Sequence, residues 1–182
     1  MSTHEAGARG IAVTQGAAGL AANGPVFRGV SHLALDAKGR VAIPAKYRDA
    51  LVPPPVAPEP AAEPSGALVL TVDPSRCLLL YPRAAWEPIQ ARLMGLSSFN
   101  EPIRRLQRLL VGYAEDVDLD AAGRILVSSE LRAYAGLGHR VVLVGQGNKF
   151  ELWDEPRWQE QTAQTITFAT GALPPELDGF SL

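Results

Sequence analysis

The sequence predicts an α+β fold, mainly β with short helices, in which two internal repeats interleave around a pseudo-twofold axis and close a small β-barrel. The pattern Asp-x-x-Gly-Arg occurs twice, at residues 36–40 and 120–124, and a short β-type run and a helix start follow each copy. Four short strands and one helix cannot bury their apolar faces alone, so two such units are expected to share one core.

The first repeat, residues 26–85, is expected to begin with a hairpin, in which a strand leads into a turn and a return strand follows it. Gly39 stands where this turn needs a positive φ, and Pro44 suits the first position of a helix. Residues 52–66 are rich in proline, which predicts a solvated loop. In order, we expect strand 29–35, turn 36–39, strand 40–43, helix 44–51, a hairpin of 67–72 and 76–81, and helix 83–94.

The second repeat, residues 113–157, shows the same order and follows linking helices in residues 86–112. An apolar stripe predicts a helix over 101–110, whose three arginines either face solvent or contact DNA or a subunit. Ser128 can cap the helix of this repeat. In order, we expect strand 113–119, turn 120–123, strand 124–127, helix 128–136, a hairpin of 141–144 and 149–153 that turns at 145–148, and helix 155–165.

Both ends of the chain are expected to lie outside the fold. Residues 1–25 are rich in Ala and Gly without a period, which predicts a disordered extension. Residues 158–182 are expected to contain the end of the last helix and a loose tail. Val26 stands where an initiator would stand, so a misplaced translation start is a hypothesis that the N-terminal mass of the native protein would test.

The composition is that of a globular protein in a reducing compartment. The 182 residues are 47% hydrophobic and 20% charged, and no apolar stretch reaches the roughly 18 residues of a membrane span. Cys77 is the single cysteine, which excludes an intrachain disulfide and fits the cytoplasm. It stands in an apolar run, so we expect a buried thiol. Trp86, Trp153 and Trp158 are expected to pack in the core or an interface.

Charge distinguishes the two repeats, although the net charge of the whole chain is −2. The stretch 28–48 holds five basic residues and one acidic residue, a net of +4, whereas 113–132 holds two basic and five acidic residues, a net of −3. A polyanion such as DNA is therefore expected to bind the first repeat. The basic candidates of that repeat are Arg28, Lys38, Arg40, Lys46 and Arg48.

The repeated turn has a readable chemistry. Its Asp can accept hydrogen bonds from backbone N–H groups that follow, its Gly permits a left-handed residue, and its Arg can bridge back to the Asp. We therefore expect structural roles for Asp36, Gly39, Asp120, Gly123 and Arg124. Arg40 is expected to contact DNA instead, because neighbouring lysines make its setting cationic and an Arg fork can address phosphates or a guanine edge.

The sequence predicts no enzyme, metal site or cofactor. Its three histidines, His4, His32 and His139, are isolated and have no metal-ligand spacing with the cysteine. The sequence also lacks a Gly-x-Ser-x-Gly motif, a phosphate loop and a dinucleotide fingerprint.

As an ordered set, seven segments between about residues 26 and 165 resemble the MraZ family of bacterial transcriptional regulators, which are built from two AbrB-like units. These segments are Phe27-Arg28-Gly29, residues 35–40, Pro44 with Tyr47-Arg48, and residues 77–82, 104–110, 120–124 and 144–153. The N-terminal extension and the proline-rich loop depart from the family pattern without touching its motifs.

The resemblance implies a swapped-hairpin barrel that assembles into a ring of, commonly, about eight subunits. It also implies binding to repeated short boxes of double-stranded promoter DNA, with the family's DNA-contacting Arg at Arg40 and Lys38 beside it. The expected function is repression of the division and cell-wall gene cluster that contains the regulator's own gene. Such a protein would be cytoplasmic and associated with the nucleoid.

Two other functions stay open at this point. An AbrB-like antitoxin, or partner-binding module, would need a segment that folds onto a toxin, and the Gly- and Pro-punctuated C-terminal tail is a poor candidate for one. A small-molecule-binding barrel or cryptic enzyme would need convergent polar residues in an apolar pocket.

Overall fold

A computed structural model describes residues 25–51 and 67–169, with the backbone alone at residues 165–169. The expected N-terminal extension, the proline-rich loop and the C-terminal tail lie outside the described residues. The elements of the first half are β1 (Phe27–Ala34), β2 (Arg40–Ala42), α1 (Ala45–Leu51), β3 (Leu68–Val72), β4 (Leu78–Pro82) and α2 (Arg83–Met94). After α3 (Glu101–Leu110), the second half contains β5 (Glu115–Val117), β6 (Arg124–Leu126), α4 (Ser129–Ala135), β7 (Arg140–Gly147), β8 (Lys149–Asp154) and α5 (Glu155–Ala169).

The strands form a six-stranded antiparallel sheet of order β1-β7-β8-β4-β3-β5 and a separate two-stranded ribbon, β2-β6. Strands β1 to β4 of the first half correspond to β5 to β8 of the second half. When each strand is exchanged with its counterpart, both orders stay the same, read from the opposite edge. Edge strand β1 pairs with β7 and edge strand β5 pairs with β3, so each half completes the sheet of the other half. The mixed α+β class expected from the sequence is confirmed.

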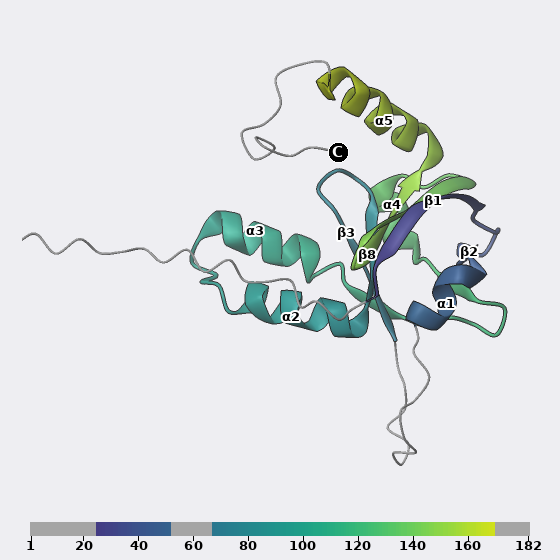
Figure 1. Ribbon diagram of the computed structural model, residues 1–182. Helices are drawn as coiled ribbons and strands as arrows, with labels where there is room; N and C mark the ends of the chain where they lie inside the picture. The colour runs from purple at the N-terminus through teal and green to yellow at the C-terminus, as the bar shows by residue number, and fades with distance from the viewer. Residues whose placement is uncertain (1–24, 52–66, 170–182) are drawn as a thin grey trace, which may run out of the picture.

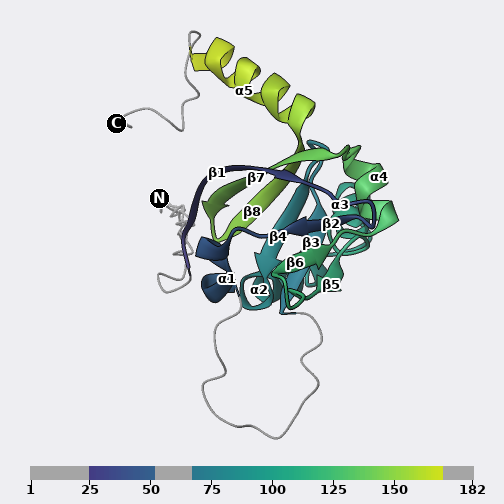
Figure 2. The same ribbon diagram turned by 90° about the vertical axis from the view of Figure 1, so that its right-hand side faces the viewer.

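The expected closed barrel is not formed by strand pairing in the described residues. The large sheet has edges at β1 and β5, and the ribbon is a second sheet (Figures 1 and 2). A single bridge, Leu35 to Val41, connects the two arms of the first turn. The expectation that the strands around this turn pair with each other is therefore wrong, because the three residues of β2 pair with β6 instead of β1.

Other element boundaries differ in smaller ways. β7 continues through the glycines expected to form a four-residue turn, and Gln146 pairs with Lys149. The turn is thus the two-residue Gly147-Asn148, where Gly147 has φ +71°. Strand β5 is shorter than expected, and α5 extends four residues beyond residue 165. The expected boundaries of the two linking helices at 83–94 and 101–110 agree with α2 and α3.

Both faces of the central strands β3 and β4 are buried, which explains why these strands are continuously apolar. Alternate residues of β4 face opposite layers: Leu78 and Leu80 join the core beneath the ribbon, and Leu79 and Tyr81 join a second cluster next to α2. Trp86 and Trp153 are buried in that second cluster and Trp158 packs against it, as expected from the sequence. The expected burial of Cys77 is confirmed, and this burial raises the pKa of its thiol.

A cluster of three aromatic rings fixes the start of β1 to α1. The Phe150 ring centroid lies 4.3 Å from that of Phe27 and 4.8 Å from that of Tyr47, and Phe150 is fully buried. The Tyr47 hydroxyl donates a 2.6 Å hydrogen bond to the carbonyl of Arg28. Residues from three elements therefore depend on the side chain at position 150.

Phe150→Ala should lower the free energy of unfolding by about 3–5 kcal/mol, because it removes a buried ring and leaves a cavity. Denaturant unfolding followed by circular dichroism measures the loss. Val30→Ala, at a side chain that is 48% exposed on β1, is the control and should change stability by less than about 0.5 kcal/mol. Equal losses in the two variants would contradict the assignment of the aromatic cluster as core.

Candidate nucleic-acid interface

The β2–β6 ribbon has one buried face and one outward face. Val41 and Ile125 are paired and are 0% and 1% exposed, so the ribbon is anchored to the core through its inner face. Because side chains alternate along a strand, the neighbouring positions point outward. There, Arg40 stands opposite Leu126 and Arg124 stands opposite Ala42.

Asp36 ties the first turn together. One of its carboxylate oxygens accepts hydrogen bonds from the backbone N–H groups of Lys38 and Arg40, both at 2.9 Å. The other oxygen accepts a 2.7 Å hydrogen bond from the Arg40 Nε and pairs with its Nη2 at 2.7 Å. These contacts lower the pKa of the Asp36 carboxyl, the backbone N–H of Arg40 having the largest effect.

Asp120 ties the second turn with the same set of contacts. It accepts from the backbone N–H groups of Ala122 and Arg124 at 2.9 Å and from the Arg124 Nε at 2.8 Å. The Arg124 side chain has the largest effect on the pKa of Asp120, which falls to about 2. In return, Asp120 raises the pKa of Arg124, and the negative charge of Asp36 raises it further.

Backbone hydrogen bonds and two arginines link each turn to the other half of the chain. Val127 N–H donates to the Gly39 carbonyl and Ile43 N–H donates to the Gly123 carbonyl, both at 2.9 Å. The Arg132 guanidinium lies so close to Gly39 that a Cβ there would clash with it, and Arg48 covers Gly123 in the same way. Each glycine, at φ +81° and +72°, therefore serves both the turn and a close contact across the repeats.

Sequence reasoning missed Arg132. The signal was present, because Arg132 follows Arg124 at the same spacing as Arg48 follows Arg40. The structure also places Arg48, expected as a DNA contact, against the second turn, where its Nε donates a 2.8 Å hydrogen bond to the Ile43 carbonyl.

The other basic candidates divide into two groups. Lys38 is exposed on the first turn, next to Arg40. Arg28 and Lys46 are exposed at the opposite end of β1, where the Lys46 ammonium lies 4.7 Å from the centre of the Tyr47 ring. The structure therefore brings Lys38 and Arg40 together and separates them from Arg28 and Lys46 along the length of β1.

The charged residues that surround the two turns in the structure differ from those that lie near them in the sequence. Three acids of the second repeat bind elsewhere: Glu115 accepts from the Ser128 hydroxyl, Asp116 pairs with Arg83, and Asp118 accepts from the Ala67 N–H. The two joined turns hold two acids, Asp36 and Asp120, and a third acid, Glu130, stands in the first turn of α4 near Arg132. The basic residues there are Lys38, Arg40, Arg48, Arg124 and Arg132. The second turn thus shares a basic setting with the first.

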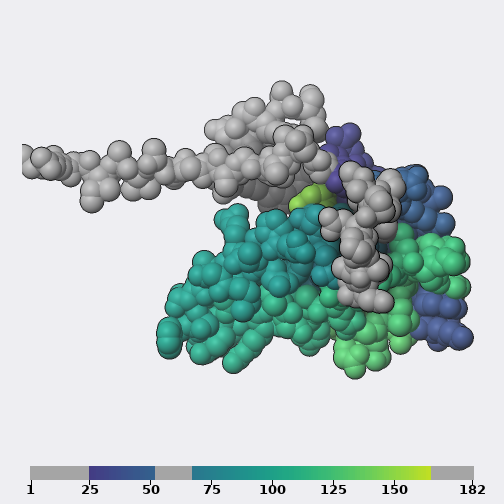
Figure 3. Space-filling view, turned by 90° about the horizontal axis from the view of Figure 1, so that it is seen from below, coloured from purple at the N-terminus to yellow at the C-terminus, as the bar shows by residue number. Residues whose placement is uncertain are grey.

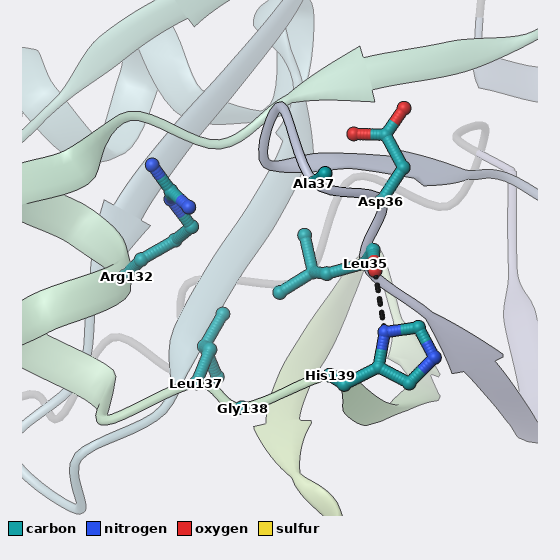
Figure 4. Close-up of a pocket in the computed structure, with 7 residues that line it drawn as sticks. All are labelled: Leu35, Asp36, Ala37, Arg132, Leu137, Gly138 and His139. Carbon is teal, nitrogen blue, oxygen red and sulfur yellow. Dashed lines mark hydrogen bonds between the residues drawn. The ribbon is translucent and has the colours of Figure 1, made fainter.

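A shallow pocket of about 420 Å³ lies beside the first turn (Figure 4). Its lining residues are Leu35, Asp36, Ala37, Arg132, Leu137, Gly138 and His139. His139 Nδ1 makes a 2.8 Å hydrogen bond with the Leu35 carbonyl across the pocket, and the Asp36 carboxylate points away from the histidine (Figure 4). The polar side chains that line the pocket therefore do not converge on one point, as a small-molecule site would require.

Comparison with known proteins decides the family. The family model "MraZ protein, putative antitoxin-like" matches residues 26–109 and again 110–172. The chain belongs to the MraZ family. Proteins named transcriptional regulator MraZ from Methylobacillus flagellatus and Thiobacillus denitrificans are 55% and 51% identical over 157 residues, covering 86% of this chain and 100% of each relative. The MraZ of Coxiella burnetii is 47% identical over 163 residues, with the same coverage.

Residues 25–51 and 67–169 lack two features of other functional classes. No helix there is long and apolar enough to cross a membrane. The same residues contain no group of three or more His, Cys, Asp or Glu side chains arranged to hold a metal ion.

Asp120→Asn should lower the melting temperature most at neutral pH. The pKa of Asp120 in the folded protein, about 2, lies below its ordinary value of 3.8. Its ionised form therefore stabilises the fold above the unfolded pKa, and this contribution is lost as the pH falls towards about 2. Melting curves between pH 7 and pH 2 measure the effect, with Asp49→Asn on α1 as the control. A difference from wild type that grows as the pH falls would contradict the pairing.

Proposed function

We propose that this protein is a sequence-specific DNA-binding transcriptional regulator whose β2–β6 ribbon reads the major groove. The observation that carries the proposal is an exposed two-stranded ribbon with an Arg guanidinium on its outward face. The major groove of B-DNA admits a two-stranded ribbon, and Arg is the side chain that most commonly contacts guanine there. The names of the relatives, transcriptional regulator MraZ, support this function.

Within the ribbon, Arg40 is the proposed base-reading side chain. Its guanidinium is held by Asp36 through Nε and Nη2, while 31% of its side chain stays exposed. Among the described residues, the guanidinium makes no further hydrogen bond. An Arg fixed in this way loses little conformational entropy when it binds, which favours specific recognition.

The other basic residues have positioning roles in this proposal. Lys38 adds a charge beside Arg40 that can contact a phosphate, and phosphate contacts fix register without reading sequence. Arg28 and Lys46 lie at the other end of β1, so in this proposal they contact phosphates apart from the ribbon. Arg48 holds the second turn, and no metal or cofactor is invoked.

We also propose that the protein assembles into a ring of about eight copies. Helices α2 and α3 lie side by side and project from the sheet (Figures 1 and 3). Phe99 between them is 96% exposed, and Met94 and Leu96 are 58% and 46% exposed. A groove of about 250 Å³ lies beside them, lined by Ile89, Arg92, Leu93 and Leu96. Exposed apolar surface of this kind typically marks a protein–protein contact.

A ring would explain how a small ribbon binds DNA tightly. Several ribbons on one rim can contact consecutive promoter boxes, and each bound ribbon raises the effective concentration of the next. The target we propose is the promoter of the division and cell-wall cluster that contains its own gene, where binding represses transcription. This places the protein in the cytoplasm, on the nucleoid.

Arg40→Ala should abolish binding to the DNA upstream of the protein's own gene and leave assembly unchanged, because the side chain contacts bases and lies outside the proposed ring contact. Footprinting and gel shifts measure binding, and size-exclusion chromatography measures assembly. Arg157→Ala, the same change of charge on α5, should bind as wild type. Normal binding by the Arg40 variant would refute the assignment.

Phe99→Glu should reduce the assembly to small species, because it places a charge in the apolar surface of the α2–α3 pair. Light scattering coupled to size-exclusion chromatography measures the mass. Leu126→Glu is the matched control, since Leu126 is also apolar and 56% exposed but lies on the ribbon. It should keep the assembly intact, and a full-sized Phe99 variant would show that this surface is not the contact.

A further inference from the structure

We propose that Arg124 is a second DNA-reading side chain, so that one ribbon reads a box with an arginine from each repeat. This inference rests on the proposed function and corrects the purely structural role expected for Arg124 from the charge of its sequence neighbours.

Position is the first argument. Arg40 and Arg124 stand on neighbouring antiparallel strands, and both point to the outward face of the ribbon because Val41 and Ile125 occupy the buried face. Two residues separate their positions in the ladder, with Arg40 opposite Leu126 and Arg124 opposite Ala42. A ribbon that presents Arg40 to a groove therefore presents Arg124 to the same groove.

The second argument is that an ion pair already holds the Arg124 guanidinium in place. The Arg124 Nε and Nη2 bind one oxygen of Asp120 at 2.8 and 2.7 Å, as Arg40 binds Asp36 at 2.7 and 2.7 Å. The exposed fractions of the two side chains are 34% and 31%. The ion pair and the exposure that suit Arg40 to a guanine edge are therefore also present at Arg124.

Electrostatics is the third argument. The acids that surround Arg124 in the sequence include Asp116 and Asp118, which bind groups around the start and end of the β3–β4 hairpin. The fold also brings Arg48 of the first repeat into contact with the second turn, at Gly123. The local charge around Arg124 is therefore compatible with a phosphate backbone.

The two ends of the ribbon differ in detail, which predicts an asymmetric box. The first turn carries exposed Lys38 where the second turn carries exposed Ala122. Leu126, 56% exposed, stands opposite Arg40, whereas the smaller Ala42 stands opposite Arg124. Apolar side chains can contact a thymine methyl group, so each arginine would read its base beside a different neighbour.

A comparison of Arg124→Gln with Asp120→Asn tests the proposal. Arg124→Gln removes the guanidinium and should weaken promoter binding by about 10- to 100-fold, the range of one bidentate base contact. Asp120→Asn keeps the guanidinium and weakens only the ion pair that holds it, so it should reduce binding by less than Arg124→Gln does. If Arg124 served the turn alone, the two variants would lose affinity equally, and that result would overturn the proposal.

A gain-of-function variant avoids any dependence on folding defects. Ala122→Lys gives the second turn the lysine of the first and should tighten promoter binding, whereas Gln159→Lys at an exposed position of α5, with the same added charge, should leave it near wild type. Equal affinities of these two variants would count against the proposal. Failure of the wild type to bind its upstream DNA would instead refute the proposed function, and loss of binding by Arg40→Gln with normal binding by Arg124→Gln would refute this inference alone.

Discussion

The pairing of β2 with β6 is the constraint on which the rest of the structure depends. Three residues of each strand form the ladder, and the residues just beyond it extend the contact through Val127 to Gly39 and Ile43 to Gly123. Neither half can supply this ladder alone. Burial of Val41 and Ile125 stabilises it, since each fully buried side chain of this size contributes about 1.5–3 kcal/mol relative to exposure. The same pairing sets both arginines on one outward face.

The strand exchange also explains why each turn needs its Asp and its Gly. A turn whose arms pair with each other could rely on ladder hydrogen bonds, but here a single bridge joins the arms of the first turn. Asp36 supplies the missing ties by accepting from the backbone at two positions and from Arg40. Gly39 leaves room for Arg132 from the other half. Each Asp-x-x-Gly-Arg motif thus connects an edge strand of the large sheet to a strand of the ribbon.

Local patterns were sufficient to predict the helices and most strands, because capping, proline and periodicity act over a few residues. The linking helices at 83–94 and 101–110 were correctly placed for this reason. Strand partners could not be derived in the same way, since β1 pairs with a strand more than a hundred residues later. Sequence reasoning assigned β2 to the nearer strand, and the ladder of β2 with β6 lies outside the range of any local signal.

The charges around the candidate site also depend on residues that are far apart in the sequence. Counting charges along the chain separated a basic first repeat from an acidic second one, and this count identified Lys38 and Arg40. It could not show that Asp116 would bind Arg83, or that Arg48 and Arg132 would each cover the turn of the other repeat. Arg132 has the least visible role of these in the sequence, because its contact with Gly39 exists only after strand exchange.

The small size of the ribbon has a consequence for recognition. Three residues per strand can place few side chains in a groove. In the proposed mode of binding, two arginine contacts, each worth about 1–3 kcal/mol of discrimination, would set the specificity available to one copy. The net charge of the chain, −2, adds no general attraction to DNA, and binding must come from the local cluster of basic residues. Tight binding by such a protein therefore requires several ribbons on several boxes at once, because linked weak contacts gain affinity through effective concentration. A short ribbon on a chain of net negative charge, together with the exposed apolar surface of α2 and α3, thus favours a regulator that reads DNA only as an assembly.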